Sequence, residues 1–392
     1  MLVEKIKKLS LKYYPLIKEL REHFHQYPEL SFEEVKTAKK ICEILDKYQI
    51  SYTPQIAKTG IIAQIKGTKT SPKARCILLR ADMDALPVEE VNDIAFCSLN
   101  KGIMHACGHD GHMAGLIGAI LILNELKDEF SGTIKFMFQP AEENYGGAEP
   151  MIKEGALEGV DAVFACHLWG STPEGQVQIS KNAIMAGVDS FDLEFIGQGG
   201  HGAHPHTTKD TILMAARFVN NIQSIVSRRL KPIEAGVISI GHIKAGTTYN
   251  IIPQNAYLKG TVRYLNENTQ KILYDGIIDT AKSIALEFGG DFKIDYKHEY
   301  PALINDDNMI DLATKAFAKL IGEANIIKDA GPDMGAEDFA FLARQRPGAY
   351  VFVGIKGTTQ PLHHSPNFNF DSKNLELLMQ GEAMVAIDFL ND

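Results

Sequence analysis

The order of strand-like and helix-like segments is the feature that most constrains what this chain can fold into. Through the first 185 residues the two kinds of segment alternate, as helix 31–48, strands 60–65 and 76–81, helix 112–127, and strands 133–139 and 162–167. Ser31, with Glu34 three residues later, is a capping-box pattern that predicts the start of the first helix. Such alternation is typical of a mostly parallel sheet flanked by helices, so we expect an α/β fold.

The rhythm of the sequence changes near residue 185. The next predicted elements are strand, helix, strand, strand, helix and strand, at 190–197, 211–229, 236–243, 256–264, 269–288 and 292–298. This βαββαβ order matches a ferredoxin-like unit. A helix, a strand and a closing helix then resume the first pattern, at 309–321, 349–353 and 375–390. We therefore predict a discontinuous first domain, 1–185 and 301–392, with a second domain, 186–300, inserted into it.

The composition argues against several classes of protein. Hydrophobic residues make up 45% of the 392 residues and charged residues 23%, an ordinary globular balance. The longest apolar run, 117–123, is far shorter than the ~20 residues of a membrane span, and no secretory signal pattern is recognisable. A net charge of −9 without a basic run disfavours nucleic acid as a partner. Five scattered cysteines without a CxxC pair predict a cytoplasmic protein.

Metal-binding and acid-base side chains gather in four segments that we expect at the ends of strands. They are LRADMDALP with Asp82 and Asp84, MHACGHDGH at 104–112, FQPAEE with Glu142 and Glu143, and ACHLWG with His167. Ligands of open α/β sheets bind at the carboxyl ends of the strands. Imidazole, thiolate and carboxylate together suit zinc or manganese, whereas calcium and magnesium prefer oxygen alone.

The segment 104–112 is the densest of the four. A lone cysteine is usually a small buried hydrophobic residue, and a lone histidine is usually a surface residue. Here three histidines, a cysteine and an aspartate fall within nine positions, which favours a metal site. Cys107 and His109, two residues apart in a glycine-containing loop, can reach one metal. The adjacent Glu142 and Glu143 allow one carboxylate to bind metal while the other stays free as a base.

With these residues in view, the chain resembles metallopeptidase family 20, and in particular its amidohydrolase branch. That branch holds hippurate hydrolases, deacetylases of N-acetylamino acids and N-acetyldiaminopimelate, and plant indole-acetyl-amino acid hydrolases. The resemblance runs from about Glu22 to Asp371 through the motifs LRADMDALPVEE, MHACGHDGH, FQPAEENYGGAEPMI, GGHGAHPH, NIIPQNAYLKGTVR, MGAEDFAFL and HHSPNF. It implies a di-zinc exopeptidase-like catalytic domain with an inserted lid or dimerisation domain.

The resemblance also implies a two-metal site. Its ligands would be Cys107, His109, Glu143, His167 and His364, holding two divalent ions, with Zn²⁺ expected ahead of Mn²⁺ or Co²⁺. Local pattern alone leaves open which histidine of HHSPNF binds metal; the family pattern selects His364, not His363. Glu142 resembles the family's general base. Asp84 would orient a metal ligand, while Asp82 occupies the place of a histidine ligand of other branches and is not assigned as a ligand.

Residues of the predicted inserted domain are implied to contact the substrate. His201 would reach the substrate carbonyl oxygen, often across a dimer in relatives, and Asn250 would add a second contact. Arg263 would bind the substrate carboxylate, a role that its planar guanidinium suits. The alternatives are a solvated strand residue for Arg263, and for Asn250 and His201 a turn residue. In MGAEDF, Gly335 would offer its backbone N–H to the substrate carboxylate. No catalytic role is assigned to Glu337 and Asp338, and capping of the helix that follows is the alternative for them.

The function implied is cleavage of the amide bond of N-acyl L-amino acids, with an acetyl, benzoyl or similar acyl group, by a homodimer. Three alternatives stay open at this point. A carboxypeptidase or dipeptidase of the same family would use the same site. The His109–Asp110 pair also occurs in two-metal phosphohydrolases, but their folds are all-helical. A non-catalytic binding protein is disfavoured because every candidate ligand and the base are present.

Overall fold

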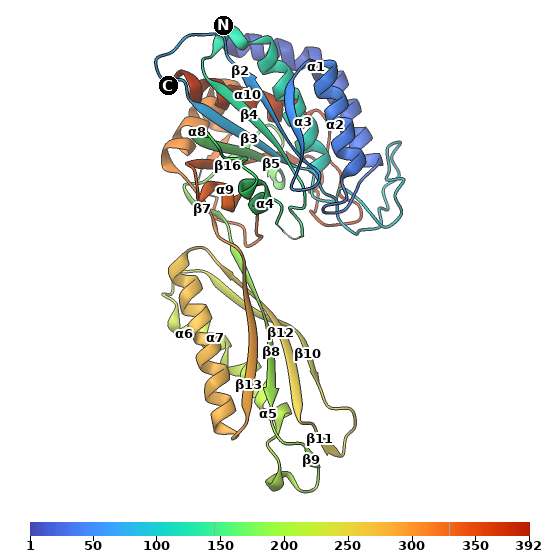
Figure 1. Ribbon diagram of the computed structural model, residues 1–392, viewed down its shortest axis with the longest axis vertical. Coiled ribbons are helices and arrows are strands. Elements are labelled where there is room, and N and C mark those ends of the chain that lie inside the picture. The colour runs from blue at the N-terminus through green and yellow to red at the C-terminus, as the bar shows by residue number, and fades with distance from the viewer. Residues whose placement is uncertain (145, 329) are drawn as a thin grey trace. The chain divides into compact units, whose positions relative to one another are not determined.

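The computed structural model describes residues 1–144, 146–328 and 330–392 (Figure 1). The described chain forms two compact units. The first consists of Met1–Ile184, Ile304–Gly331 and Asp338–Asp392, and the second of Met185–Leu303 and Pro332–Glu337. None of the helices in the described residues combines the length and apolar character needed to cross a membrane.

The first unit is built on a sheet whose strands run in the order β1-β2-β4-β3-β5-β16-β6-β15. Their bounds are β1 Ser51–Ile56, β2 Gly60–Lys66, β3 Cys76–Asp82, β4 Thr133–Gln139, β5 Ala162–Pro173, β6 Val177–Ile179, β15 Ile326–Lys328 and β16 Gly348–Lys356. The four central strands, β4, β3, β5 and β16, are parallel to one another. Every residue of β3 is buried, as expected for a central parallel strand covered on both faces. The predicted α/β fold is confirmed.

Helices cover this sheet. They are α1 Leu2–Gln26, α2 Val35–Lys47, α3 His109–Glu125, α4 Ala148–Lys153, α8 Asp307–Ile321, α9 Ala340–Ala343 and α10 Asn374–Asn391. Helix α3 packs against α1, α10 and β3, and residues 109–123 are all buried. A helix that is apolar around its whole circumference belongs in a core. Its first residue, His109, is therefore held by a rigid element.

Several local predictions for this unit are wrong in detail. Helix α3 begins at His109, not at residue 112, so the histidines of the segment 104–112 do not all lie in a loop. His167 does not end its strand, because β5 continues to Pro173 alongside β16. The capping box is not formed: α2 begins after Glu34 without a side-chain cap, and Ser31 donates its hydroxyl to Asp84 instead.

The second unit has a four-stranded antiparallel sheet in the order β10-β12-β8-β13. Its elements are β8 Gly187–Ile196, α5 Thr211–Asn221, α6 Gln223–Arg229, β10 Gly236–Ala245, β12 Asn255–Tyr264, α7 Glu267–Glu287 and β13 Asp291–Tyr300. The predicted βαββαβ order is confirmed, except that the helix predicted over 211–229 is broken at Ile222. Two short strands, β9 (Gly200–His201) and β11 (Ile251–Ile252), pair beyond one end of this sheet (Figure 1).

Short elements complete the chain. Strands β7 (Asn182–Met185) and β14 (Leu303–Asn305) pair with each other. Single 3₁₀ turns occur at Lys127–Glu129, Pro205–Thr207 and Glu323–Asn325.

Candidate metal centre

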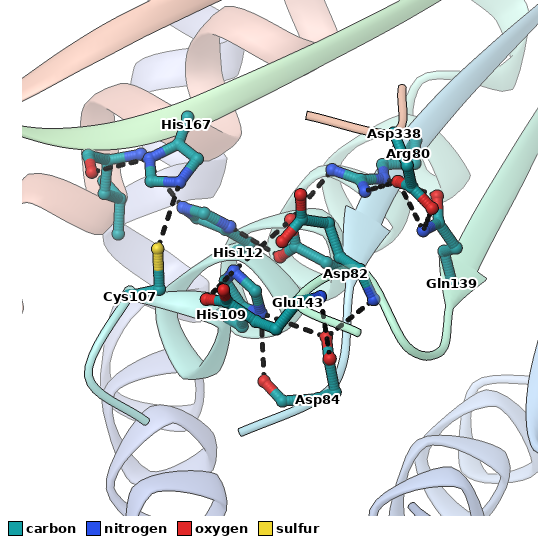
Figure 2. A network of polar contacts seen from close by, with 12 residues as sticks. Arg80, Asp82, Asp84, Cys107, His109, His112, Gln139, Glu143, His167 and Asp338 are labelled. Carbon is teal, nitrogen blue, oxygen red and sulfur yellow. Dashed lines mark hydrogen bonds and ion pairs between the residues drawn. The ribbon is translucent and has the colours of Figure 1, made fainter. Parts of the chain in front are cut away.

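Four of the predicted metal ligands, Cys107, His109, Glu143 and His167, come together where β3, β5 and the start of α3 meet (Figure 2). Cys107 precedes α3, His109 is the first residue of this helix, and His167 lies in β5. In two groups of three, the ligand atoms lie within 4.8 Å of one another: Cys107, His109 and His167 form one group, and Cys107, Glu143 and His364 form the other. The sulfur of Cys107 is common to both groups.

Hydrogen bonds fix which nitrogen of His109 faces this cluster. Its Nδ1 lies 2.9 Å from the carbonyl oxygen of Asp84, so Nδ1 carries the proton and donates it. In the neutral imidazole the lone pair of Nε2 is then free, and a metal ion bound there would take the place of a second proton. This buried Nε2 has no hydrogen-bond partner among the described residues, and it lies 3.7 Å from Oε1 of Glu143. A ligating histidine typically donates its other N–H in this way.

The other two histidines of the cluster also present Nε2. Nδ1 of His167 donates to the carbonyl oxygen of Leu168 at 2.8 Å, and its Nε2 lies 3.6 Å from Sγ of Cys107. Nε2 of His364 lies 3.3 Å from Oε1 of Glu143. Three imidazole nitrogens therefore converge with a sulfur and a carboxylate oxygen.

The electrostatics of this cluster fit a cation. Burial raises the pKa of the Cys107 thiol well above its usual range, and the carboxylates of Glu143, Glu142 and Asp82 raise it further. Burial opposes protonation of His109, but Asp82, Asp84 and Glu143 outweigh it and raise its pKa to about 10. Several acidic groups thus share a buried space with a thiol. A bound dication would compensate their charge and deprotonate the thiol outright, so the residues fit divalent metal ions.

The backbone around the cluster is strained where it presents these side chains. His364 has φ of 60°, and Ala141, the residue before Glu142, has φ of 56°. Left-handed conformations of residues other than glycine cost ~1–3 kcal/mol and gather at functional sites. Gly108, between Cys107 and His109, has φ of 99°, which glycine adopts readily.

Asp84 anchors both glutamates. Its Oδ1 accepts the backbone N–H of Glu142 at 3.1 Å, and its Oδ2 accepts the backbone N–H of Glu143 at 3.0 Å and the hydroxyl of Ser31 at 2.7 Å. The chain turns sharply after β4, so the two neighbouring side chains need not follow strand alternation. The carboxylate of Glu142 belongs to a third group of closely spaced ligand atoms, with His109 and Glu143.

Asp82 and His112 border the cluster and are hydrogen-bonded to each other. Nδ1 of His112 donates to Oδ1 of Asp82 at 2.7 Å, and its Nε2 accepts the backbone N–H of Leu168 at 3.0 Å. Both nitrogens of His112 are therefore engaged, and neither has a lone pair free for a metal. Asp82, His112 and His109 have ligand atoms close enough to form a group of their own. The two hydrogen bonds of His112 argue against that group as a metal site.

Comparison with known proteins agrees with this geometry. The model of peptidase family M20/M25/M40 matches residues 78–386. The chain belongs to this family. It is 37% identical over 370 residues to the N-acetylcysteine deacetylase of Bacillus subtilis (strain 168), covering 94% of this chain and 95% of the relative. It is 38% identical over 398 residues to thermostable carboxypeptidase 1 of Saccharolobus solfataricus, covering 100% and 99%.

A solved structure extends the likeness to the fold. The crystal structure of the Bacillus subtilis YXEP protein, described as a dinuclear metal-binding peptidase of the M20 family, matches with a TM-score of 0.86 and 33% identity, covering 97% of this chain and 99% of that one. The family resemblance predicted from the motifs is confirmed.

A buried charge network adjoins the candidate metal centre of this M20/M25/M40 protein. The guanidinium of Arg80 donates to Asp82 at 2.8 Å, to Gln139 at 2.9 Å and to Asp338 at 2.9 Å (Figure 2). Asp338 also accepts the backbone N–H of Ala148, the first residue of α4, at 2.9 Å. The carboxylate of Asp338 thus serves Arg80 and α4, and helix α9 begins without a side-chain cap at Phe339.

Sequence reasoning missed Arg80, although a signal was present. An arginine inside the apolar strand 76–82 must find a partner when that strand is buried. His112, Gln139 and Asp338 could not be assigned in the same way, since their partners lie far away in the chain. His363 belongs to none of the groups of closely spaced ligand atoms among the described residues.

In the second unit, His201 and Asn250 come together. His201 in β9 pairs with Ile251 in β11, and the carbonyl oxygen of Asn250 accepts the backbone N–H of Gly202 at 2.8 Å. Nδ1 of His201 accepts the backbone N–H of Ala203 at 3.0 Å, so its proton lies on Nε2. The side chains of His201 and Asn250 are exposed. His201 thus presents an N–H donor to solvent.

Arg263 and Gly335 lie elsewhere in the second unit. Arg263 is half-buried near the end of β12, opposite Val188 of β8. Burial lowers the pKa of its guanidinium. The backbone N–H of Gly335 donates to Oδ1 of Asp333 at 2.6 Å. A substrate carboxylate would have to displace Asp333 before it could bind this N–H group.

Proposed function

We propose that this M20/M25/M40 protein is a two-metal amidohydrolase that cleaves N-acyl L-amino acids into a carboxylic acid and a free amino acid. The observation that carries the proposal is the position of Cys107 in both ligand groups, with the carboxylate of Glu142 beside them. One ion would be held by Cys107, His109 and His167, and the other by Cys107, Glu143 and His364. Three protein ligands per ion leave a coordination position open, as catalytic sites require.

Zinc is the metal that we propose. Thiolate, imidazole and carboxylate are all zinc ligands, and tetrahedral sites with open positions are typical of catalytic zinc. Manganese and cobalt are the alternatives. When bound, two such ions supply Lewis-acid chemistry, since they polarise a carbonyl oxygen and make water more acidic.

Glu142 is the general base in this proposal. Its carboxylate takes a proton from the attacking water and returns that proton to the nitrogen of the departing amino acid. Asp84 holds the backbone of Glu142 and of Glu143, which supports separate tasks for the two carboxylates. Because Glu142 is buried, little bulk water competes for its proton.

The substrate contacts of the second unit are best explained by a homodimer. Along β8, the partner of Arg263 is Val188 and the partner of Asn255 is Ile196, eight residues further on, which at strand rise is ~26 Å. His201 and Asn250 lie beyond the Ile196 end. One small substrate cannot touch Arg263 and His201 of the same chain. If both bind substrate, they come from different subunits.

The surface of the second unit supports such pairing. Strand β10 is an edge strand of its sheet, and an edge strand can pair with a second copy. Large apolar side chains are exposed on β10, on α5 and in the segment that follows β10 in the chain. They are Ile212, Leu213, Ile243, Tyr249 and Ile251.

The cysteines of the described residues are all free, and this supports the proposed cytoplasmic location.

The experiment that tests the function is a release assay with a panel of N-acetyl and N-benzoyl L-amino acids, measured as free amino acid. The 38% identity to a carboxypeptidase favours one alternative, the removal of C-terminal residues from peptides. Dipeptides with a free amino group therefore belong in the panel. Faster cleavage of dipeptides than of every N-acyl amino acid would favour the carboxypeptidase, and no cleavage of either class would refute the proposal.

A further inference from the structure

His363, the neighbour of the proposed ligand His364, occupies a defined place beside the metal centre. Its ring stacks on Trp169 with centroids 4.9 Å apart and planes at 29°. Trp169 in turn stacks on Phe352 at 4.2 Å and 14°. On another side the ring of Phe368 lies 5.0 Å from that of His363. These contacts determine the plane of the imidazole.

Hydrogen bonding determines which nitrogen of His363 carries the proton. The backbone N–H of Gly170 donates to Nε2 at 3.0 Å, so Nε2 is the acceptor. In a neutral imidazole the other nitrogen, Nδ1, is then the donor. This Nδ1 faces Cys107, whose Sγ lies 3.9 Å away and whose backbone is also within its reach. Position 170 must be glycine for this approach, because a Cβ there would lie 2.0 Å from the carbonyl oxygen of Pro361.

We propose that His363 is a positioning residue, which donates a hydrogen bond from Nδ1 to the sulfur of Cys107. The inference rests on the proposed function, in which this sulfur serves both metal ions. A thiolate shared by two ions and surrounded by the carboxylates of Glu142 and Glu143 is rich in negative charge. An N–H group pointed at the sulfur orients its lone pairs and reduces the electron density that it donates to the ions.

Three substitutions separate this role from simple packing. His363→Phe keeps an aromatic ring against Trp169 but has no N–H donor. In His363→Asn the side-chain amide nitrogen takes the place of Nδ1, so a donor to the sulfur is retained. In His363→Gln the side-chain amide takes the place of Nε2 instead. No group then takes the place of Nδ1, so this variant has no donor to the sulfur. The Asn and Gln variants are matched in polarity and differ mainly in where the donor lies.

The measurement is the absorption spectrum of the metal-free full-length chain titrated with Co²⁺, read at the sulfur-to-cobalt charge-transfer band. We expect this band to move to longer wavelength in His363→Phe and His363→Gln, because an unbonded sulfur gives up its electron more easily. The dissociation constant for Co²⁺ should rise ~10–100-fold in the same two variants, because the sulfur is no longer oriented and its thiolate form is no longer stabilised by a donor. In His363→Asn both quantities should stay close to those of the wild type.

The results that overturn the inference are distinct from those that overturn the proposed function. If the band moves equally in the Asn and Gln variants, or moves in none of the three variants, the proposed hydrogen bond to the sulfur is refuted. Melting temperatures of the metal-free variants serve as the folding control, and a common loss of stability without a band shift means packing alone. Cys107→Ser should abolish the band. A wild-type protein that has no such band refutes the metal centre itself, before His363 is considered.

Discussion

Replacing Asp84 with asparagine removes a charged oxygen from the point where the backbones of Glu142 and Glu143 are held. In the native protein two carboxylate oxygens receive the N–H of Glu142, the N–H of Glu143 and the hydroxyl of Ser31. Asparagine keeps one oxygen. If this oxygen still accepts the N–H of Glu143 and the hydroxyl of Ser31, the new amide NH₂ group faces the N–H of Glu142. Two hydrogen-bond donors then oppose each other without an acceptor.

The size of the effect follows from these contacts. A hydrogen bond to a charged group is worth ~1.5–3 kcal/mol, so the free energy of unfolding of the metal-free protein should fall by about that amount in Asp84→Asn. The backbone of Glu142 also loses its anchor. A displacement of ~1 Å in a reacting group can lower turnover ~10²-fold, and we expect a loss of this order.

Urea unfolding of the metal-free variant and turnover of an N-acyl amino acid measure the two effects. Ser31→Ala is the matched control, because it removes the third donor but leaves both backbone N–H groups on the carboxylate. Its turnover should stay close to that of the wild type. If Asp84→Asn has the same free energy of unfolding and the same turnover rate as Ser31→Ala, the role of Asp84 as the anchor of both glutamates is refuted.

Three further predictions follow from the proposed roles. Glu142→Gln should lower turnover by ~10²–10⁴-fold with full metal content, whereas Glu143→Gln should lose metal; near-normal turnover of Glu142→Gln would mean that the two assignments are reversed. Arg263→Lys should be nearly as damaging as Arg263→Ala, because a point charge cannot replace a bidentate fork, and equal rates on acid and amide substrates would exclude Arg263 from the site. His201→Ala should lower turnover ~10²–10³-fold, and mixing it with Glu142→Gln chains should restore activity if His201 acts across subunits; full activity of His201→Ala alone would exclude it.

The sequence predicts the fold well where periodicity is strong. The buried parallel strands and the βαββαβ order of the second unit are local patterns, and both are observed. The periodicity of the sequence does not predict helix α1, and it does not indicate that the helix predicted over 211–229 is broken at Ile222. The capping box at Ser31 and Glu34 fails for a physical reason. Glu34 accepts the backbone N–H of Ala141, and Ser31 donates to Asp84, so the site uses both side chains.

The candidate site also contains some residues that the sequence predicts and others that it does not. Dense clusters such as 104–112 are visible in the sequence because several ligand types lie within nine positions. Contacts between distant residues are not visible, and Arg80 and Asp338 are 258 positions apart. Both histidines of HHSPNF lie near Cys107, and no local pattern specifies that only His364 brings a ligand atom together with those of Cys107 and Glu143. The family resemblance supplied that choice, and His364 lies with Cys107 and Glu143 in the structure.

The metal content of purified, active protein is the measurement that decides whether Cys107 holds a pair of divalent ions. Elemental analysis should find two equivalents per chain in the wild type and about one in His167→Ala and in His364→Ala, since each removes a ligand of a single ion. Cys107→Ser should lose both ions together with activity, while Cys97→Ser, the control for loss of a thiol outside the groups, should keep both. Active protein without metal, or a Cys107→Ser variant that keeps two ions and normal turnover, would exclude a pair of catalytic ions held by Cys107.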